Sequence, residues 1–184
     1  MLDFTLALVG AGPLPESSMR EGSQQLADHC SAELVVLACG SEPQSSLQAV
    51  ASRQRERTRP TLLCLSGDAA MAQGSSGSWL DALAAWRCPV LLLAQPNAAG
   101  LIPGMAPASV ALCHSLDIPL IGLAQLGGSW DQAARRMDGL PWCGLLDSPA
   151  DGGDASDALV CSIQQRWKRM SLAMSSPLTT SSML

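Results

Sequence analysis

The stretch from Val9 to Met19, VGAGPLPESSM, carries residue types found in phosphate-binding loops. It follows the apolar run DFTLAL and precedes a helix-like segment, which is the usual setting for such a loop. In the form G-x-x-x-x-G-K-[ST], backbone N–H groups cradle the phosphate, the lysine neutralises it and the hydroxyl binds Mg²⁺. The pattern predicts Gly10, Gly12, Ser17 and Ser18 as the nucleotide-binding residues of a residual loop, and it assigns no catalytic residue.

The same stretch lacks groups that hold phosphate. Pro13 and Pro15 have no backbone N–H to donate. The sole lysine of the chain, Lys168, lies in the last helix-like segment, far along the sequence from the loop. We therefore interpret the stretch as a phosphate loop that has lost its ability to hold phosphate.

The elements that must position these residues are short apolar runs separated by helix-like segments. Six runs are nearly all apolar, which is typical of parallel strands covered on both faces, and they span 4–10, 33–40, 60–67, 88–96, 118–125 and 140–146. The helix-like segments span 17–30, 43–57, 77–86, 105–115, 129–137 and 154–171. Alternation of this kind predicts a single three-layer α/β domain, with a mainly parallel sheet of about six strands and helices on both faces.

The predicted domain covers residues 1–174 and is followed by a flexible Ser/Thr-rich tail at 175–184. In such folds, ligands bind where the carboxyl ends of the strands lead into loops. These loops are expected at 10–17, 40–43, 67–77, 96–104 and 126–129, and the segment 72–78 within them is expected to be flexible.

Composition excludes several classes of partner. The formal charge of −5 disfavours nucleic acid, because binding to phosphates needs clustered lysine and arginine. No apolar run approaches the roughly 20 residues that span a bilayer, and no signal peptide is recognisable at the start, so we expect a cytoplasmic protein without a membrane partner. Seven cysteines without a C-x-x-C pair indicate buried thiols in a reducing compartment.

Other patterns do not assemble into a site. In GAGPLP, which begins like a dinucleotide fingerprint, Pro15 stands at the third glycine, although Glu42 would serve as the acidic residue and keeps that alternative open. Neighbours on a helix point about 100° apart, so Cys113 and His114 cannot act together as nucleophile and base. The arginine-rich segment 53–59 is interpreted as a solvated helix end, with an anion site as the alternative, and the acidic segment 147–157 as a loop that caps the last helix.

From residue 78 onward the order of features resembles the second half of dethiobiotin synthetases. The resemblance is carried by the segment SWLDALAAWRCPVLLLAQPNAAGLIPGMAPASVALCHSLDIPLIGLAQLGG, followed by GLPWCGLL at 139–146. In the part of the chain before residue 78, TLLCLSGD corresponds to the end of the family's third strand, and FTLALVGAGPLPESS corresponds to its phosphate-loop strand and turn. The resemblance implies a P-loop NTPase-like fold, a dimer, and the use of ATP, Mg²⁺ and carbon dioxide to close a ureido ring.

The family's ligand positions are mostly changed in this chain. Aligned on the family's spacing, Gly10 keeps the first glycine, Glu16 replaces the second, Ser17 takes the lysine position and Ser18 keeps the magnesium hydroxyl. The family's acidic residue at the end of the third strand is Ser66 here, and Asp68, two residues on, is the candidate that would hold a metal together with Ser18. The family's Asn-His after the fourth strand aligns with Pro103-Gly104, and its adenine-binding Asn with Leu126.

Three functional hypotheses follow from the resemblance. The first is a dethiobiotin-synthetase-like protein with a degraded ATP site, a non-catalytic binding or interaction protein linked to biotin metabolism, as a homodimer or paired with a related synthetase. It expects no cofactor. The second is an active ATP-dependent synthetase with an altered nucleotide site, which uses ATP and Mg²⁺. The third is a small-molecule enzyme that uses the crevice at the strand ends without ATP.

Overall fold

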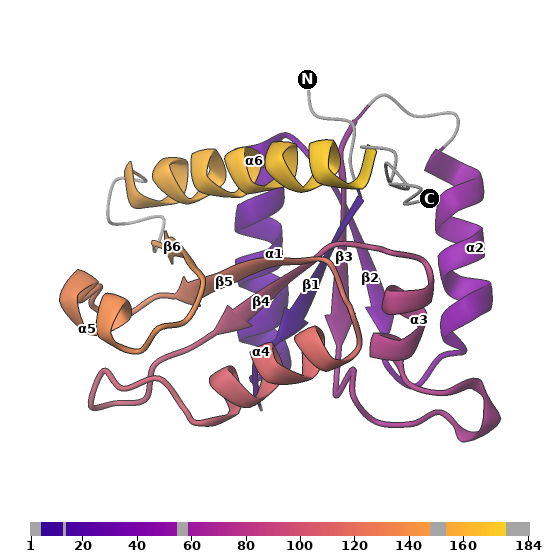
Figure 1. Cartoon of the computed structure of the whole chain (residues 1–184), viewed down its shortest axis with the longest axis horizontal. Helices are drawn as coiled ribbons and strands as arrows, with labels where there is room; N and C mark the ends of the chain where they lie inside the picture. The colour runs from indigo at the N-terminus through magenta and orange to yellow at the C-terminus, as the bar shows by residue number, and fades with distance from the viewer. Residues whose placement is uncertain (1–4, 13, 55–58, 148–153, 176–184) are drawn as a thin grey trace, which may run out of the picture.

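The computed structural model describes residues 5–12, 14–54, 59–147 and 154–175. Six strands form one sheet, in the order β2-β3-β1-β4-β5-β6, and every neighbouring pair is parallel (Figure 1). The strands are β1 (Thr5–Gly10), β2 (Glu33–Ala38), β3 (Thr61–Ser66), β4 (Val90–Ala94), β5 (Leu120–Leu126) and β6 (Trp142–Leu146). Each of the six apolar runs contains one of these strands.

Helices connect the strands in strict alternation. They are α1 (Glu16–Cys30), α2 (Pro43–Gln54), α3 (Trp79–Ala85), α4 (Met105–Ser115), α5 (Gln132–Met137) and α6 (Asp154–Ser175), with a one-turn 3₁₀ helix, η1 (Gly74–Ser76), before α3. The prediction of a single α/β domain with helices on both faces of a parallel sheet is confirmed. Only the boundaries differ, because the prolines and most of the glycines at the ends of the apolar runs lie outside the strands.

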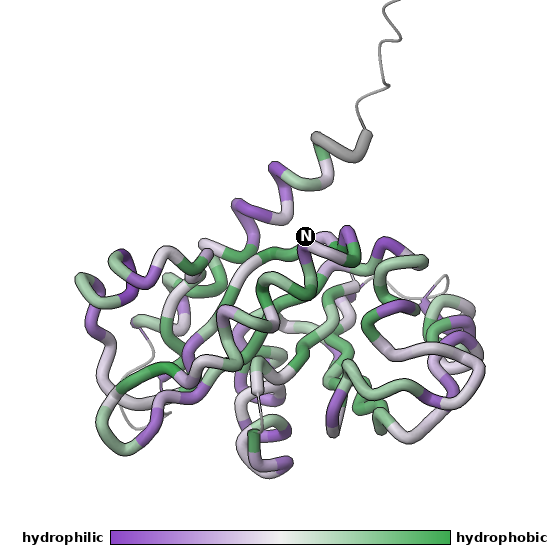
Figure 2. The backbone as a smooth tube through the Cα atoms, turned by 60° about the horizontal axis from the view of Figure 1, so that its bottom comes forward, coloured by the Kyte–Doolittle hydropathy of each residue, from purple (hydrophilic) through white to green (hydrophobic). Residues whose placement is uncertain are grey.

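The two faces of the sheet carry separate hydrophobic cores. Residues that alternate along β1 belong to different cores: Ala7 and Val9 pack with α2, α3 and α4, whereas Leu6 and Leu8 pack with α1 and α6. This is the period of two expected for a strand covered on both sides. In Figure 2, green hydrophobic stretches of the chain run through the middle of the molecule.

The central strand β1 lies between β3 and β4. Leu8 is in register with Cys64 of β3 and with Leu91 of β4, so the carboxyl ends of the three strands meet at one edge of the sheet. The chain leaves β1 toward β2 on one side and leaves β4 toward β5 on the other. Reversals of this kind are where open parallel sheets leave a crevice for ligands.

Several expectations need correction or lie outside the described residues. The segment 72–78 contains η1, and Ser78 caps α3, whereas the flexibility of the segment stays a prediction. Ser175, assigned to the tail, ends α6. Cys161 is exposed, whereas Cys39, Cys64, Cys88 and Cys113 are buried as expected. The described residues do not include 55–58, 148–153 or 176–184, which hold most of the arginine-rich segment, of the acidic segment and of the tail.

None of the described helices combines the length and the apolar character needed to cross a membrane.

Candidate functional site

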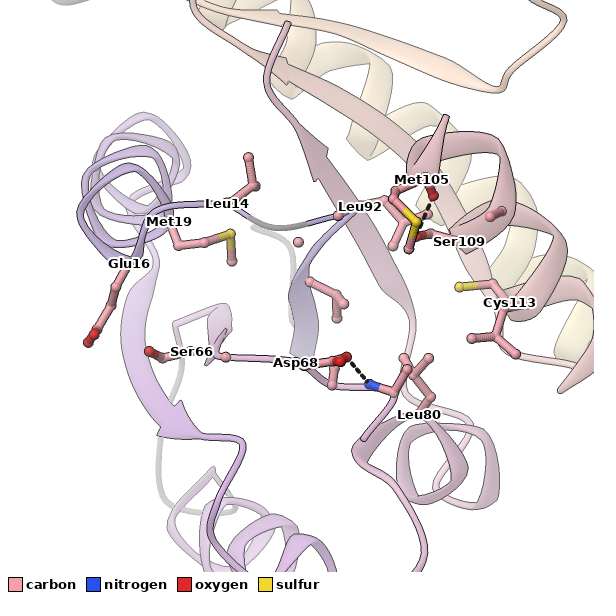
Figure 3. Close-up of a pocket in the computed structure, with 18 residues that line it drawn as sticks. Leu14, Glu16, Met19, Ser66, Asp68, Leu80, Leu92, Met105, Ser109 and Cys113 are labelled. Carbon is pink, nitrogen blue, oxygen red and sulfur yellow. Dashed lines mark hydrogen bonds between the residues drawn. The ribbon is translucent and has the colours of Figure 1, made fainter. Parts of the chain in front are cut away.

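A cavity of about 530 Å³ lies at the carboxyl ends of β1, β3 and β4 (Figure 3). Its floor is formed by Val9 and Leu92 from the strands and by Leu80 from α3. The loops after β1 and β3 form part of its rim, whereas no residue of the expected loops 40–43, 96–104 or 126–129 lines it. The prediction of a ligand crevice at the strand ends thus corresponds to a cavity beside the central strand.

Two helices form opposite walls of this cavity. Met19 comes from α1, and Met105, Ser109 and Cys113 come from α4 (Figure 3). The Ser109 hydroxyl donates to the carbonyl oxygen of Met105 at 2.8 Å, so it is already engaged within the helix. Sequence reasoning missed the contribution of α4, although the spacing of four residues between 105, 109 and 113 places these side chains on one face of a helix.

The loop between β1 and α1 offers few donors to an anion. The N–H of Ala11 donates to the carbonyl oxygen of Leu93 at 2.8 Å, and the N–H of Leu14 donates to that of Gly12 at 2.9 Å. Residues 13 and 15 are prolines, which have no N–H. Four of the five residues from 11 to 15 therefore present no free amide N–H, whereas a phosphate loop depends on several that converge.

Gly12 has a geometric reason to be glycine. Its φ is +116°, and a Cβ at this position would lie 3.0 Å from the Cβ of Met105. The loop thus passes against the beginning of α4, and the glycine permits this approach. Met105 therefore packs directly against the loop after β1.

The beginning of α1 carries an acid and not a cation. Pro15 is the N-cap residue and supplies no side-chain cap, and Glu16 stands in the first turn, where a carboxylate interacts favourably with the helix dipole. Glu16 forms an ion pair of 3.0 Å with Arg20, and both side chains are about two-thirds exposed (64% and 65%). Arg20 is therefore engaged with Glu16, and it does not line the cavity.

The predicted site residues are only partly brought together. Gly10, Gly12 and Asp68 line the same cavity. Ser17 is exposed and lines none of the cavities described here, and Ser18 lines a second cavity of about 780 Å³ on the other side of α1. The two candidate magnesium ligands, Ser18 and Asp68, thus face different cavities.

Asp68 lies at the rim of the cavity, in the loop after β3. Its Oδ1 accepts the backbone N–H of Ala70 at 2.9 Å, which fixes the carboxylate beside the cavity (Figure 3). Ser66, at the position where the resembled family has its acidic residue, is half-buried at the end of β3. In the described part of the chain, no cluster of three or more His, Cys, Asp or Glu residues could hold a metal ion.

Cys113, which lines the cavity, and Cys39, which is buried outside its lining, are poor nucleophiles. Burial raises the pKa of the Cys113 thiol, which lines the cavity, to about 11. Burial, with smaller contributions from the charges of Asp68 and Cys64, also raises the pKa of Cys39 to about 11. Because the thiolate is the reactive form, both side chains remain unreactive thiols at neutral pH.

The second cavity lies between α1 and the carboxyl ends of β5 and β6. Most of its lining residues are polar or charged in type, and they include Gln24 and Gln25 of α1, with Gln95, Leu126 and Asp147 from the strand ends. Gln25 donates to the carbonyl oxygen of Asp147. Leu126, the position aligned with the family's adenine-binding Asn, contributes an apolar side chain to this cavity.

The sequence matches no protein-family model and no curated protein. Among solved structures, the chain is similar to the MinD cell division protein of Aquifex aeolicus, with 11% identity and a TM-score of 0.49 over 95% of this chain and 99% of that one. It is also similar to the MinC:MinD cell division protein complex of Aquifex aeolicus, with 10% identity and a TM-score of 0.47 over 95% and 98%. Identities and TM-scores at this level carry no information on ligand, partner or activity.

Proposed function

We propose that this chain is a non-catalytic binding protein, whose cavity beside β1 takes a small, largely apolar molecule and not a nucleoside triphosphate. The observation that supports it most directly is the loop from Ala11 to Pro15, in which four of five residues offer no free N–H. The first turn of α1 also carries Glu16, paired with Arg20, where a phosphate loop would have a lysine.

The walls of the cavity support an apolar ligand. Val9, Leu80 and Leu92 are nearly fully buried and provide aliphatic surface, while Met19 and Met105 provide flexible side chains. Methionine adapts to ligands of different shape because it is unbranched and polarisable. A volume of about 530 Å³ lies within the range of roughly 300–1,000 Å³ that is usual for small-molecule sites.

The remaining expectations stay predictions. A link to biotin metabolism, a homodimer or a pair with a related synthetase, and a cytoplasmic location rest on the sequence resemblance and composition alone. An active synthetase would need ATP and Mg²⁺ at the loop after β1, and a titration described below tests this alternative directly.

Binding of a neutral fluorophore tests the proposed use of the cavity. N-phenyl-1-naphthylamine is uncharged at neutral pH and becomes bright in apolar surroundings. We expect it to bind the full chain with saturable enhancement. Replacing Ala108, an exposed residue of α4 that lines the cavity, with phenylalanine should reduce this enhancement by filling the cavity.

The control is Ala111→Phe, which is also exposed on the same helix but lies outside the cavity lining. It should bind the fluorophore like the unmodified chain. The proposal fails if the unmodified chain gives no saturable enhancement, or if Ala108→Phe and Ala111→Phe behave alike.

A further inference from the structure

The ionisable residues that line the cavity are acidic. Glu16 and Asp68 are among its lining residues, which include no lysine, arginine or histidine. The remaining polar contributions come from two serines, one thiol and the backbone of three glycines. A ligand that enters this cavity therefore meets negative charge at the rim and hydrocarbon in the interior.

Asp68 is the carboxylate that a ligand would meet. Glu16 is paired with Arg20 at 3.0 Å, and in Figure 3 its side chain points outward, away from Asp68 and Met105. Asp68 uses its Oδ1 to accept the N–H of Ala70. Within the described residues, Oδ2 of Asp68 accepts no hydrogen bond, and the carboxylate forms no ion pair.

The apolar interior begins close to this carboxylate. Leu80, with only 5% of its surface exposed, lies beside Asp68 in Figure 3, and its N–H donates to the carbonyl oxygen of Ala69 at 3.2 Å. Met105 forms the opposite wall, and Leu112, also on α4, lines the cavity as well. Charge at the rim and hydrocarbon within are complementary to an amphiphile with one cationic end.

We propose that the ligand class of this cavity is an aliphatic molecule that carries a protonated amine, with the ammonium group against Asp68 and the hydrocarbon between α1 and α4. The inference rests on the proposed function, because it names the ligand of the same cavity. A carboxylate or phosphate at the same end of the ligand would face Asp68 without a compensating cation. A neutral alcohol would lose the charge-assisted hydrogen bond that an ammonium group donates to a carboxylate.

Displacement of N-phenyl-1-naphthylamine by ligands of equal chain length tests the charge preference. The competitors are n-octylamine, n-octanol and n-octanoate at neutral pH. We expect octylamine to displace the fluorophore at a concentration several-fold lower than octanol, because Asp68 is exposed and its charge is screened by solvent, and octanoate to be the weakest. Octanoate equal to or stronger than octylamine would overturn the inference.

The variant Asp68→Asn assigns the preference to one side chain. Asparagine keeps an oxygen that accepts the N–H of Ala70 and removes the charge, so the loop is retained. We expect the preference for octylamine over octanol to disappear in this variant. The control Asp117→Asn removes an exposed carboxylate between α4 and β5, at the amino ends of the strands, and should leave the preference unchanged.

The outcomes separate the inference from the proposed function. If the fluorophore binds and Ala108→Phe prevents it, but Asp68→Asn keeps the preference for octylamine, the cavity binds apolar molecules and the amine inference is wrong. If Ala108→Phe and Ala111→Phe are alike, the proposed function itself fails, whatever the competitors do.

Discussion

The two halves of the sheet differ in the charged residues that they carry and in what these residues contact. On the side of β5 and β6, the guanidinium of Arg166 donates to the carbonyl oxygens of Ile121 (3.0 Å), Pro141 (2.7 Å) and Trp142 (2.6 Å). On the side of β1 and β3, the cavity is lined by two acids and no cation. Arginine thus joins strands and loops on one side, while the other side keeps an open, apolar and acidic cavity.

A second arginine, Arg135, forms structural hydrogen bonds at the carboxyl end of β5. It is 7% exposed, and its Nε donates to Oε1 of the fully buried Gln125 at 2.9 Å, while Nη2 donates to the carbonyl oxygen of Gly100 at 3.2 Å. The guanidinium also lies over the ring of Trp142, 5.3 Å from its centroid. Arg135 and Arg166 are thus engaged with backbone and side-chain oxygens, and neither lines the cavity beside β1.

The largest expected effect comes from Gly122, which lies beside the guanidinium of Arg166. Its φ is +146°, and a Cβ there would lie 2.2 Å from the carbonyl oxygen of Pro141 and 2.5 Å from Nη1 of Arg166. We expect Gly122→Ala to lower the free energy of unfolding by more than about 3 kcal/mol, or to prevent folding. Gly40→Ala, on the side of β2 with no heavy atom within 4 Å of its Cβ, should change stability by less than about 1 kcal/mol. Urea unfolding measures both, and equal effects would contradict the packing described for Gly122.

The second effect separates Arg135 from its neighbour. Arg135→Ala leaves Gln125 and the carbonyl oxygen of Gly100 without a donor, so we expect a loss of about 2–4 kcal/mol in the free energy of unfolding. Arg136→Ala removes an exposed side chain on the same short helix and should stay within about 0.5 kcal/mol. If both variants unfold at the same urea concentration, the hydrogen bonds of Arg135 do not stabilise the fold.

The third effect concerns Asp81, a carboxylate near the cavity that caps the start of α3. At the start of α3, Ser78 and Asp81 form a capping box, in which the Ser78 hydroxyl accepts the N–H of Asp81 and Asp81 accepts from the Ser78 hydroxyl and backbone. We expect Ser78→Ala to cost about 1 kcal/mol at neutral pH, measured by urea unfolding. A similar loss in Ser75→Ala, an exposed serine in η1 just before the box, would contradict the assignment.

The same capping box predicts a pH dependence. Hydrogen bonds from the Ser78 side chain, and then from its backbone, lower the pKa of Asp81. A carboxyl with a lowered folded-state pKa contributes stability above its unfolded pKa of about 3.9 and loses it as the pH falls through the folded value. The difference between Ser78→Ala and the unmodified chain should therefore shrink as the pH is lowered below about 4. A constant difference down to the lowest pH at which the chain folds would show that Asp81 contributes nothing to it.

The sheet could be predicted from the sequence because its strands are nearly all apolar, and α4 begins and ends at the predicted residues 105 and 115. The state of the loop after β1 could be predicted only in part. Its prolines are visible in the sequence, whereas the bonds of Ala11 and Leu14 to carbonyl oxygens depend on the path of the backbone. Arg135 and Arg136 are adjacent and alike in sequence, so only the packing of α5 against β5 distinguishes the buried arginine from the exposed one.

Calorimetric titration of the full chain with Mg-ATP tests whether the loop after β1 holds a nucleotide, with a parallel n-octylamine titration to show that the same preparation binds ligand. We expect no saturable heat from Mg-ATP up to about 1 mM, a limit that corresponds to less than roughly 4 kcal/mol of binding free energy. Saturable binding of Mg-ATP with a dissociation constant near 1 μM, about 8 kcal/mol, would contradict it and would favour an active nucleotide site at the loop after β1.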